Sequence, residues 1–406
     1  MSPVLSAAVQ AFFGSRMGEL GQYLSKARWQ VERGRKATAD ELAVDGLTVR
    51  PRSRWLDEKS GTAADVIGLW DLDSVPEGAV VTIAGTRVPV QDVPTEVAPF
   101  AIPDAEGDHR VPVKVMLGDA TLRTEDILIS RTRNRLARFE AIETAVKAIP
   151  RKPRSSLVES MRWNLQLLRT VNRGRSVETE IPAHRLLTRV ESMITAAGSG
   201  KRWFGPERPG DHFVRLATEG GLVTARLMVP EKLAEKPALV IALHGAGGSE
   251  NLFFDGYGDG LGPELAAKRG WLFLAPQTST RPSAIVGAVD ELERMFGAID
   301  RSRVFLMGHS MGAAATAGIH QTYPKAFARL ALLGGGGTIR DPDLFADTPT
   351  FIGVGDQDFL MRGASGFAKR LRRAGIESAV YKEYADVEHM AIVQLALPDV
   401  FAFFGN

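Results

Sequence analysis

The chain has 406 residues, of which 44% are hydrophobic and 24% are charged, and its formal net charge is +2. These values predict a folded protein with a sizeable core, and the length favours two domains over one. The near-neutral charge shows no strong signature of a polyanion-binding protein. The absence of cysteine excludes disulfides, thiolate metal sites and a cysteine nucleophile.

The sequence contains no segment of the kind that enters or crosses a membrane. No run approaches about 18 uncharged apolar residues, so we expect no membrane span. Residues 1–10 lack a basic region followed by an uninterrupted apolar one, so we expect no signal peptide. The protein would then be cytoplasmic, unless a leader has been removed.

The first half of the chain changes its pattern twice. Residues 5–24 repeat apolar side chains every three or four positions, which predicts one amphipathic helix. From about 40 to 130, short β-prone runs alternate with turn residues and predict a small β-rich module. Three helical periodicities follow between 130 and 197. With no repeat and no catalytic constellation in sight, we predict an accessory domain over residues 1–200.

Within this half, the stretch from residue 131 to 175 is strongly basic. It carries twelve Lys or Arg against three Glu, a local balance of +9, so the rest of the chain carries −7. A basic surface of this kind could hold a polyanion or an acidic partner. We favour a solvated helix face, or charges paired with acidic residues elsewhere, because aromatic residues are not interleaved as in nucleic-acid grooves. We therefore expect no nucleic-acid partner.

Residues 201–406 form the second predicted domain, in which continuous apolar runs alternate with amphipathic helical patterns. The strand-like runs lie at 213–216, 222–227, 238–243, 271–274, 304–307, 330–333 and 350–354, and the helical patterns lie around 283–297, 311–322 and 363–373. This alternation predicts an α/β fold with a mostly parallel sheet covered by helices on both faces. Active residues of such a sheet lie in the loops at the carboxyl ends of its strands.

One motif in this domain predicts a nucleophile. Residues 308–312 read Gly-His-Ser-Met-Gly, after a buried strand pattern and before a helix rich in small residues. A G-x-S-x-G sequence in that context is a nucleophile elbow, in which a tight turn exposes the hydroxyl of the serine, here Ser310. The glycines two residues before and after the serine leave room for the turn.

A serine nucleophile needs a base and an acid, which follow it in the order acid and then histidine. Of the seven histidines, two follow the motif with any room, His320 inside the elbow helix and His389 after a strand-like run at 380–384. His389 is the base by elimination.

The acid is expected after the strand at 350–354, where Asp356 and Asp358 compete. We prefer Asp358. Asp386 and Glu388 lie too close to His389 in the sequence to reach its far nitrogen easily.

Two further groups of residues are expected around the reacting carbonyl. A strand at 241–243 runs into a glycine-rich turn at 244–248, the position of an HGGG-type oxyanion loop. The backbone N–H groups of Ala246 and Met311 are the predicted oxyanion donors, and His244 is interpreted as ordering the loop. Phe253 and Tyr257 are candidate substrate-binding residues, although buried packing explains them equally well.

Taken together, residues 210–406 resemble an α/β-hydrolase-fold serine hydrolase. The resemblance is greatest to the esterase group of carboxylesterases and of polyhydroxybutyrate-depolymerase-like, feruloyl-esterase-like and dienelactone-hydrolase-like enzymes. The matching segments are 244–248, 271–276, 308–312, 355–358 and His389. The family's G-x-x-D pattern supports Asp358 over Asp356. The resemblance implies hydrolysis of a small-molecule or polymeric carboxylic ester through an acyl-enzyme, with no cofactor or metal. Dienelactone hydrolysis itself uses a cysteine that this chain lacks.

Two alternatives stay open. One is a serine peptidase of the prolyl-oligopeptidase type, although no propeller repeat is visible. The other is a catalytically silent binding protein with a hydrolase shell. Residues 1–200 would serve as a lid, a polymer-binding module or an oligomerisation surface, so a homo-oligomer is left open.

Overall fold

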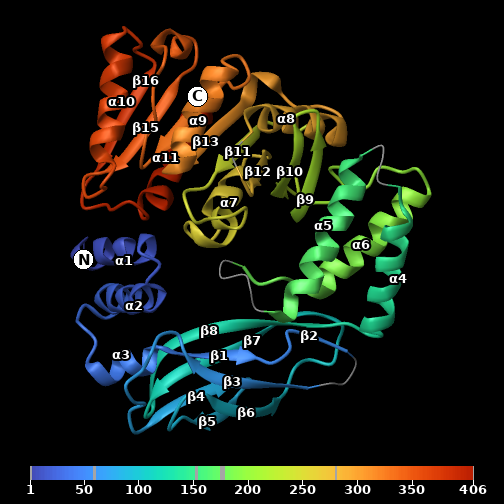
Figure 1. Ribbon diagram of the computed structural model, residues 1–406, viewed down its shortest axis with the longest axis vertical. Helices are drawn as coiled ribbons and strands as arrows, with labels where there is room; N and C mark the ends of the chain where they lie inside the picture. The colour runs from blue at the N-terminus through green and yellow to red at the C-terminus, as the bar shows by residue number, and fades with distance from the viewer. Residues whose placement is uncertain (1, 58–60, 151–153, 174–178, 279–280, 406) are drawn as a thin grey trace. The chain divides into compact units, whose positions relative to one another are not determined.

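The computed structural model describes residues 2–57, 61–150, 154–173, 179–278 and 281–405. The chain divides into two compact units (Figure 1). Unit 1 comprises Met1–Ala145 and Leu165–Glu191, and unit 2 comprises Val146–Asn164 and Ser192–Asn406. The units therefore do not follow the single boundary predicted at residue 200, since residues 146–164 and 192–200 pack with the second unit.

The N-terminal helical segment is broken in two. Helix α1 spans Ser2–Phe13 and helix α2 spans Met17–Arg33, where the sequence pattern predicted one continuous helix. The break lies at Gly14-Ser15, and Ser15 has a left-handed φ of 55°. A single residue in this conformation cannot continue a right-handed helix, so the apolar periodicity survives while the helix axis changes.

Unit 1 contains the predicted β-rich module, preceded by helix α3 (Ala39–Asp45). Its described strands are β1 (Leu47–Pro51), β2 (Trp55–Leu56), β3 (Thr62–Gly68), β4 (Ala79–Ile83), β5 (Thr86–Pro89), β6 (Thr95–Phe100), β7 (Gly107–Leu117) and β8 (Ala120–Arg131). They form a three-stranded sheet in the order β1-β3-β6 and a five-stranded sheet in the order β2-β8-β7-β4-β5. Inward-facing residues of both sheets share one apolar core, which also takes in Trp29 of α2.

Three helices follow, as predicted: α4 (Arg135–Ala148), α5 (Ser156–Thr170) and α6 (Ala183–Gly198), with the short helix η1 (Val171–Arg173) after α5. Several of their basic side chains pair with acidic groups of the same unit. Arg138 contacts Glu106 and Glu191, and Arg169 contacts Glu143. These pairs agree with the interpretation of the basic stretch as charges that meet acidic partners.

Unit 2 is built on one large sheet. Its described strands are β9 (Gly210–Thr218), β10 (Gly221–Val229), β11 (Leu239–Leu243), β12 (Leu272–Pro276), β13 (Val304–His309), β14 (Arg329–Leu333), β15 (Thr350–Gly355) and β16 (Ala379–Tyr384). They lie in the order β16-β15-β14-β13-β11-β12-β10-β9. The pairs from β16 to β12 are parallel, and β12-β10-β9 are antiparallel, so the prediction of a mostly parallel sheet is confirmed.

Polar side chains of α5 cover the outer edge of β9. The Ser156 hydroxyl accepts a hydrogen bond from the Ala217 N–H at 2.8 Å, and the Ser160 hydroxyl accepts one from the Arg215 N–H at 2.9 Å. The Asn164 side chain donates to the Phe213 carbonyl at 2.9 Å. Residues four apart on one helix face thus meet backbone groups two apart on the edge strand. These bonds explain why residues 146–164 belong to unit 2.

Helices flank the sheet on both faces. They are the π-helical turn η2 (Leu252–Gly256), α7 (Leu261–Ala267), α8 (Pro282–Phe296), α9 (Met311–Thr322), α10 (Met361–Arg373) and α11 (Ile392–Gly405), with short 3-10 turns η3 (Arg301–Arg303) and η4 (Pro342–Phe345). On one face η2, α7 and α11 share a core with alternate residues of the strands. The strand residues in between are also fully buried, where α8, α9 and α10 contact the sheet.

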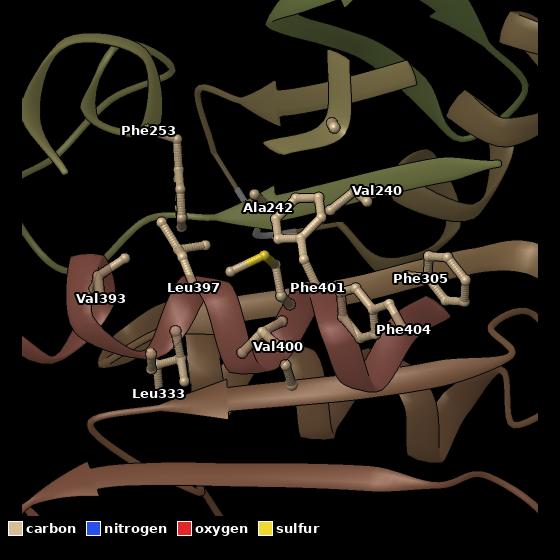
Figure 2. Packing of buried hydrophobic residues seen from close by; sticks show 14 of the residues in the cluster. Val240, Ala242, Phe253, Phe305, Leu333, Val393, Leu397, Val400, Phe401 and Phe404 are labelled. Carbon is tan, nitrogen blue, oxygen red and sulfur yellow. The ribbon is translucent and has the colours of Figure 1, made fainter. Parts of the chain in front are cut away.

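The core beneath α11 is rich in phenylalanine (Figure 2). Phe305 of β13 stacks on Phe404 of α11 with ring centroids 4.6 Å apart, and Trp271 stacks on Phe401 at 5.9 Å. Burying each such side chain contributes about 1.5–3 kcal/mol. Because α11 begins three residues after His389, this core fixes one end of the loop that carries the histidine.

Candidate active site

The turn after β13 is as sharp as the nucleophile-elbow motif predicts. Ser310 has φ 56° and ψ −114°, and α9 begins at the next residue. A methyl group on Gly308 would collide with the carbonyl of Gly312, and one on Gly312 would collide with the carbonyl of Leu243. Both positions therefore require glycine, and a serine in this backbone conformation stores strain of about 1–3 kcal/mol.

Ser310, His389 and Asp358 lie in a hydrogen-bonded chain. His389 Nε2 lies 2.9 Å from Ser310 Oγ, and His389 Nδ1 lies 2.9 Å from both carboxylate oxygens of Asp358. A carboxylate accepts hydrogen bonds, so Nδ1 carries the proton and Nε2 is left to accept from the serine hydroxyl. The exposed fractions are 9% for Ser310, 5% for Asp358 and 1% for His389.

Asp356, the competing acid, lies elsewhere. Its N–H donates to the Tyr384 carbonyl at 3.0 Å, and its Oδ1 is buried without a hydrogen-bond partner among the described residues. Asp386 is likewise absent from the chain of hydrogen bonds. Of the carboxylates considered from the sequence, Asp358 is the one that the structure brings to the imidazole.

Glu388 shapes the histidine loop. Its carboxylate accepts hydrogen bonds from the N–H groups of Met390 at 2.9 Å and Ala391 at 2.7 Å, in the turn that leads into α11. Burial raises the pKa of Glu388, although these two N–H donors act in the opposite direction. The sequence sets Glu388 aside as the triad acid, and it does not predict this role in the loop. The sequence signal for this role is an acidic residue shortly before the start of a helix, where its carboxylate can accept hydrogen bonds from N–H groups two and three residues further on.

The first two glycines after β14, Gly334 and Gly335, pack closely against residues of the site. Gly334 has a φ of 56°, and a methyl group there would lie 3.0 Å from Asp358 Oδ2 and 3.2 Å from the His309 ring. A methyl group on Gly335 would lie 3.2 Å from the Ser310 carbonyl oxygen. These glycines let β14 approach the site, rather than simply turning the chain.

The glycine-rich turn that carries Ala246 lies beside Ser310, and Met311 directly follows the serine. A methyl group on Gly245 would lie 3.3 Å from Ser310 Cβ, which puts the glycine-rich turn beside the serine. Within the described residues, no acceptor is found for the N–H groups of Ala246 and Met311. His244 lies with its two ring nitrogens 2.7 Å from the carbonyls of Gly245 and Gln277, in agreement with a role in ordering the loop.

The two predicted substrate-binding residues are placed differently from expectation. Phe253 is 0% exposed and Tyr257 is 3% exposed, so neither side chain lines an open pocket. The π-helical turn η2 directs Phe253 into the core against Phe273, and the Tyr257 hydroxyl lies 2.6 Å from His309 Nδ1. The alternative of buried packing, which the sequence left open, is the correct one.

Other apolar side chains are open to solvent beside the triad. Phe359 is 59% exposed, and its ring centroid lies 4.4 Å from that of His389. Met311, directly after the serine, is 49% exposed. No periodicity singles out Phe359, and its position next to Asp358 is the one sequence signal for it.

No group of three or more metal-ligating side chains occurs in the part of the chain that the structure describes. Within the same residues, no helix is long and apolar enough to cross a bilayer.

The strand order, the antiparallel start of the sheet and the sharp serine turn after β13 together decide the fold of unit 2. Unit 2 has the α/β-hydrolase fold. The resemblance inferred from the sequence is thus confirmed for the architecture of this α/β-hydrolase unit.

No family model matches the chain. Over 118 residues the sequence is 31% identical to feruloyl esterase B of Neurospora crassa, a match covering 24% of this chain and 39% of the relative. The chain therefore spans well under half the length of that relative.

Solved structures with similar architecture are distant in sequence. A feruloyl esterase module from Clostridium thermocellum has a TM-score of 0.42 at 12% identity and covers 49% of this chain and 90% of the module. The fluorophosphonate-binding serine hydrolase F of Staphylococcus aureus has a TM-score of 0.42 at 16% identity, with 49% and 100% covered.

Proposed function

We propose that this protein hydrolyses carboxylic esters through an acyl-enzyme on Ser310. The observation that carries the proposal is the hydrogen-bonded chain from Ser310 Oγ through the His389 ring to Asp358. A nucleophile, a base and an orienting acid in this order constitute the arrangement of serine hydrolases. The sequence similarity to a feruloyl esterase supports the same reaction class.

In the proposed first step, His389 Nε2 takes the proton of Ser310 as its Oγ attacks the ester carbonyl. The new C–O bond converts the carbonyl oxygen into an oxyanion, which would accept hydrogen bonds from the N–H groups of Ala246 and Met311. Losing one such donor typically costs about 10²–10³-fold in rate. Asp358 holds the imidazole in the tautomer required and stabilises the imidazolium.

The tetrahedral intermediate then collapses. The ester C–O bond breaks, and the alcohol leaves with the proton from His389. Water attacks the acyl-enzyme with His389 again as base, which releases the carboxylic acid and restores Ser310. Every proton is carried by the imidazole.

Phe359 and Met311 are the proposed substrate contacts in place of Phe253 and Tyr257. Both are exposed apolar side chains on residues next to members of the triad. An aromatic ring on the ester would pack edge-to-face or offset against Phe359. Replacing Phe359 with alanine should raise KM for phenyl-bearing esters several-fold more than for an alkyl ester of equal leaving group. Equal changes for both esters would contradict this assignment.

The peptidase alternative receives no support from unit 1. Its described strands form sheets of three and five strands, whereas a propeller repeats four-stranded blades. Activity on a p-nitrophenyl ester without activity on a prolyl anilide would separate the two reaction classes.

The deciding experiment is labelling with a fluorophosphonate, followed by peptide mapping, together with a series of p-nitrophenyl esters of increasing chain length. We expect one labelled peptide that contains Ser310 and loss of both label and turnover in Ser310→Ala. Failure of the folded wild-type protein to react with either reagent would contradict the proposal and favour a binding protein with a hydrolase shell.

A further inference from the structure

His309, the residue directly before the serine, is buried at the centre of a second set of hydrogen bonds. Its side chain is 1% exposed. Ring atom Nε2 lies 2.9 Å from the main-chain oxygen of His389, and Nδ1 lies 2.6 Å from the Tyr257 hydroxyl. No pattern in the sequence gives His309 a role beyond its place in the G-x-S-x-G motif.

The chemistry of the partners fixes the tautomer of His309. A carbonyl oxygen can accept a hydrogen bond but cannot donate one, so Nε2 of His309 carries the proton and donates to His389. Nδ1 is then unprotonated and accepts the hydrogen bond of the Tyr257 O–H. Burial, together with the smaller effect of the neighbouring His389, lowers the pKa of His309 to about 3, so the ring stays neutral near pH 7.

The position of Tyr257 is fixed by contacts of the turn that precedes it. It follows the π-helical turn η2, in which Asp255 pairs with the buried Arg226 of β10. Arg226 also pairs with Asp211 of β9 and lies over the Phe254 ring at 4.3 Å. The Tyr257 hydroxyl is therefore presented from a turn that is anchored to the antiparallel end of the sheet.

We propose that His309, held in place by Tyr257, is a positioning residue that sets the distance between the His389 main chain and Ser310. The proposal rests on the proposed function. Its basis is that one side chain joins the strand carrying the nucleophile to the loop carrying the base. The rings of His309 and His389 also pack with centroids 4.7 Å apart. A displacement of about 1 Å between Nε2 and Oγ costs about 100-fold in rate.

The chain contains a matched control in His320. It is fully buried in α9, and its Nε2 lies 2.8 Å from the main-chain oxygen of Leu344 in η4. The two histidines thus make the same kind of contact, a buried ring nitrogen against a backbone carbonyl. They differ in the carbonyl that each one contacts. His309 contacts that of His389, the proposed base, whereas His320 contacts that of Leu344 in a structural turn.

The test compares His309→Leu, His309→Gln, His320→Leu and His320→Gln, with kcat and KM for p-nitrophenyl acetate, the rate of fluorophosphonate inactivation and the midpoint of urea unfolding. We expect His309→Leu to lower kcat about 100-fold with KM within about twofold of wild type. His309→Gln should recover to within about tenfold of wild type, because its amide can still donate to the His389 carbonyl. Both His320 variants should keep kcat, whatever their loss of stability.

Tyr257→Phe covers the case in which His309→Leu does not fold. It removes one hydroxyl and should lower kcat about tenfold without raising KM, because Nδ1 loses its donor. A kcat for folded His309→Leu no lower than that for His320→Leu, or an unchanged kcat for Tyr257→Phe, overturns the inference while the wild type still turns over. A wild type that is neither labelled nor active would instead overturn the proposed function, and this inference with it.

Discussion

The loop that carries Ser310 and the loop that carries His389 meet at one site but are held by different forces. The serine turn is fixed by steric exclusion, since Gly308 and Gly312 leave no room for a side chain against neighbouring backbone. The histidine loop is fixed by polar contacts, from Glu388 to the following amides and from His309 to the His389 carbonyl. Steric exclusion does not change with protonation, whereas the polar contacts of the histidine loop depend on the protonation of Glu388 and His309 and therefore on pH.

The largest effect is expected when a reacting side chain is removed, whether from the serine turn or from the histidine loop. Ser310→Ala and His389→Ala should each lower kcat/KM by about 10⁴-fold or more, because the two side chains act as one unit. The double variant should be no worse than either single one. The measurement is ester turnover together with circular dichroism as a check on folding. Near-wild-type turnover in either folded variant would remove that residue from the site.

The next largest effect is expected for the acid, Asp358, which contacts the base in the histidine loop. Asp358→Asn should lower kcat by about 10³–10⁴-fold, because an amide can donate to Nδ1 and so favours the wrong tautomer. Asp356→Asn is the matched control and should leave kcat within about threefold, since Asp356 does not contact the imidazole. The reverse order of the two effects would move the acid to Asp356.

Gly334→Ala tests whether steric exclusion also fixes the acid that contacts His389. Its new methyl group would lie 3.0 Å from Asp358 Oδ2, at a backbone φ of 56°. We expect kcat to fall about 10–100-fold through displacement of the acid. Gly363→Ala in α10 provides the control, because its methyl group would meet nothing within 4 Å. Equal kcat values for the two variants would show that the acid tolerates the intrusion.

The last expected effect is on stability rather than on turnover, and it is a pH dependence of the buried contacts made by His309. Burial lowers the pKa of His309 to about 3, from an ordinary value of 6.5 in the unfolded chain. The unfolded state therefore binds a proton first as the pH falls, so the stability due to neutral His309 is complete above pH 6.5 and is lost progressively toward pH 3. Between about pH 7 and pH 4, the urea midpoint of His309→Gln should fall less than that of wild type. A parallel fall would show that His309 does not titrate in this way.

The same division explains what the sequence predicts well. The serine turn is marked in the sequence itself, by the glycines two residues before and two residues after Ser310. The parallel strands β11 to β15 are continuous apolar runs, which the pattern also predicts. Ser310, Asp358 and His389 follow from the order of such elements, although their catalytic role stays a proposal.

Features that depend on tertiary context were missed or misplaced. Helix α11 is apolar around much of its circumference and contains Pro398, so no amphipathic pattern marks it. Phe253 and Phe359 are both aromatic residues close to glycine or aspartate in the sequence, and nothing in the local sequence separates the buried one from the exposed one. The contact of His309 with His389 joins residues 80 apart in the sequence, which no local pattern reveals.

Because side chains of α5 occupy the outer edge of β9, they should also protect the protein from aggregation through that edge. Ser156, Ser160 and Asn164 occupy backbone groups that would otherwise be free to pair with a strand of another molecule. A fragment cut at residue 201 would keep all eight strands of the large sheet and lose that cover. Such a fragment should associate edge to edge and precipitate, whereas one that begins at residue 146 retains the protecting side chains and should stay dispersed.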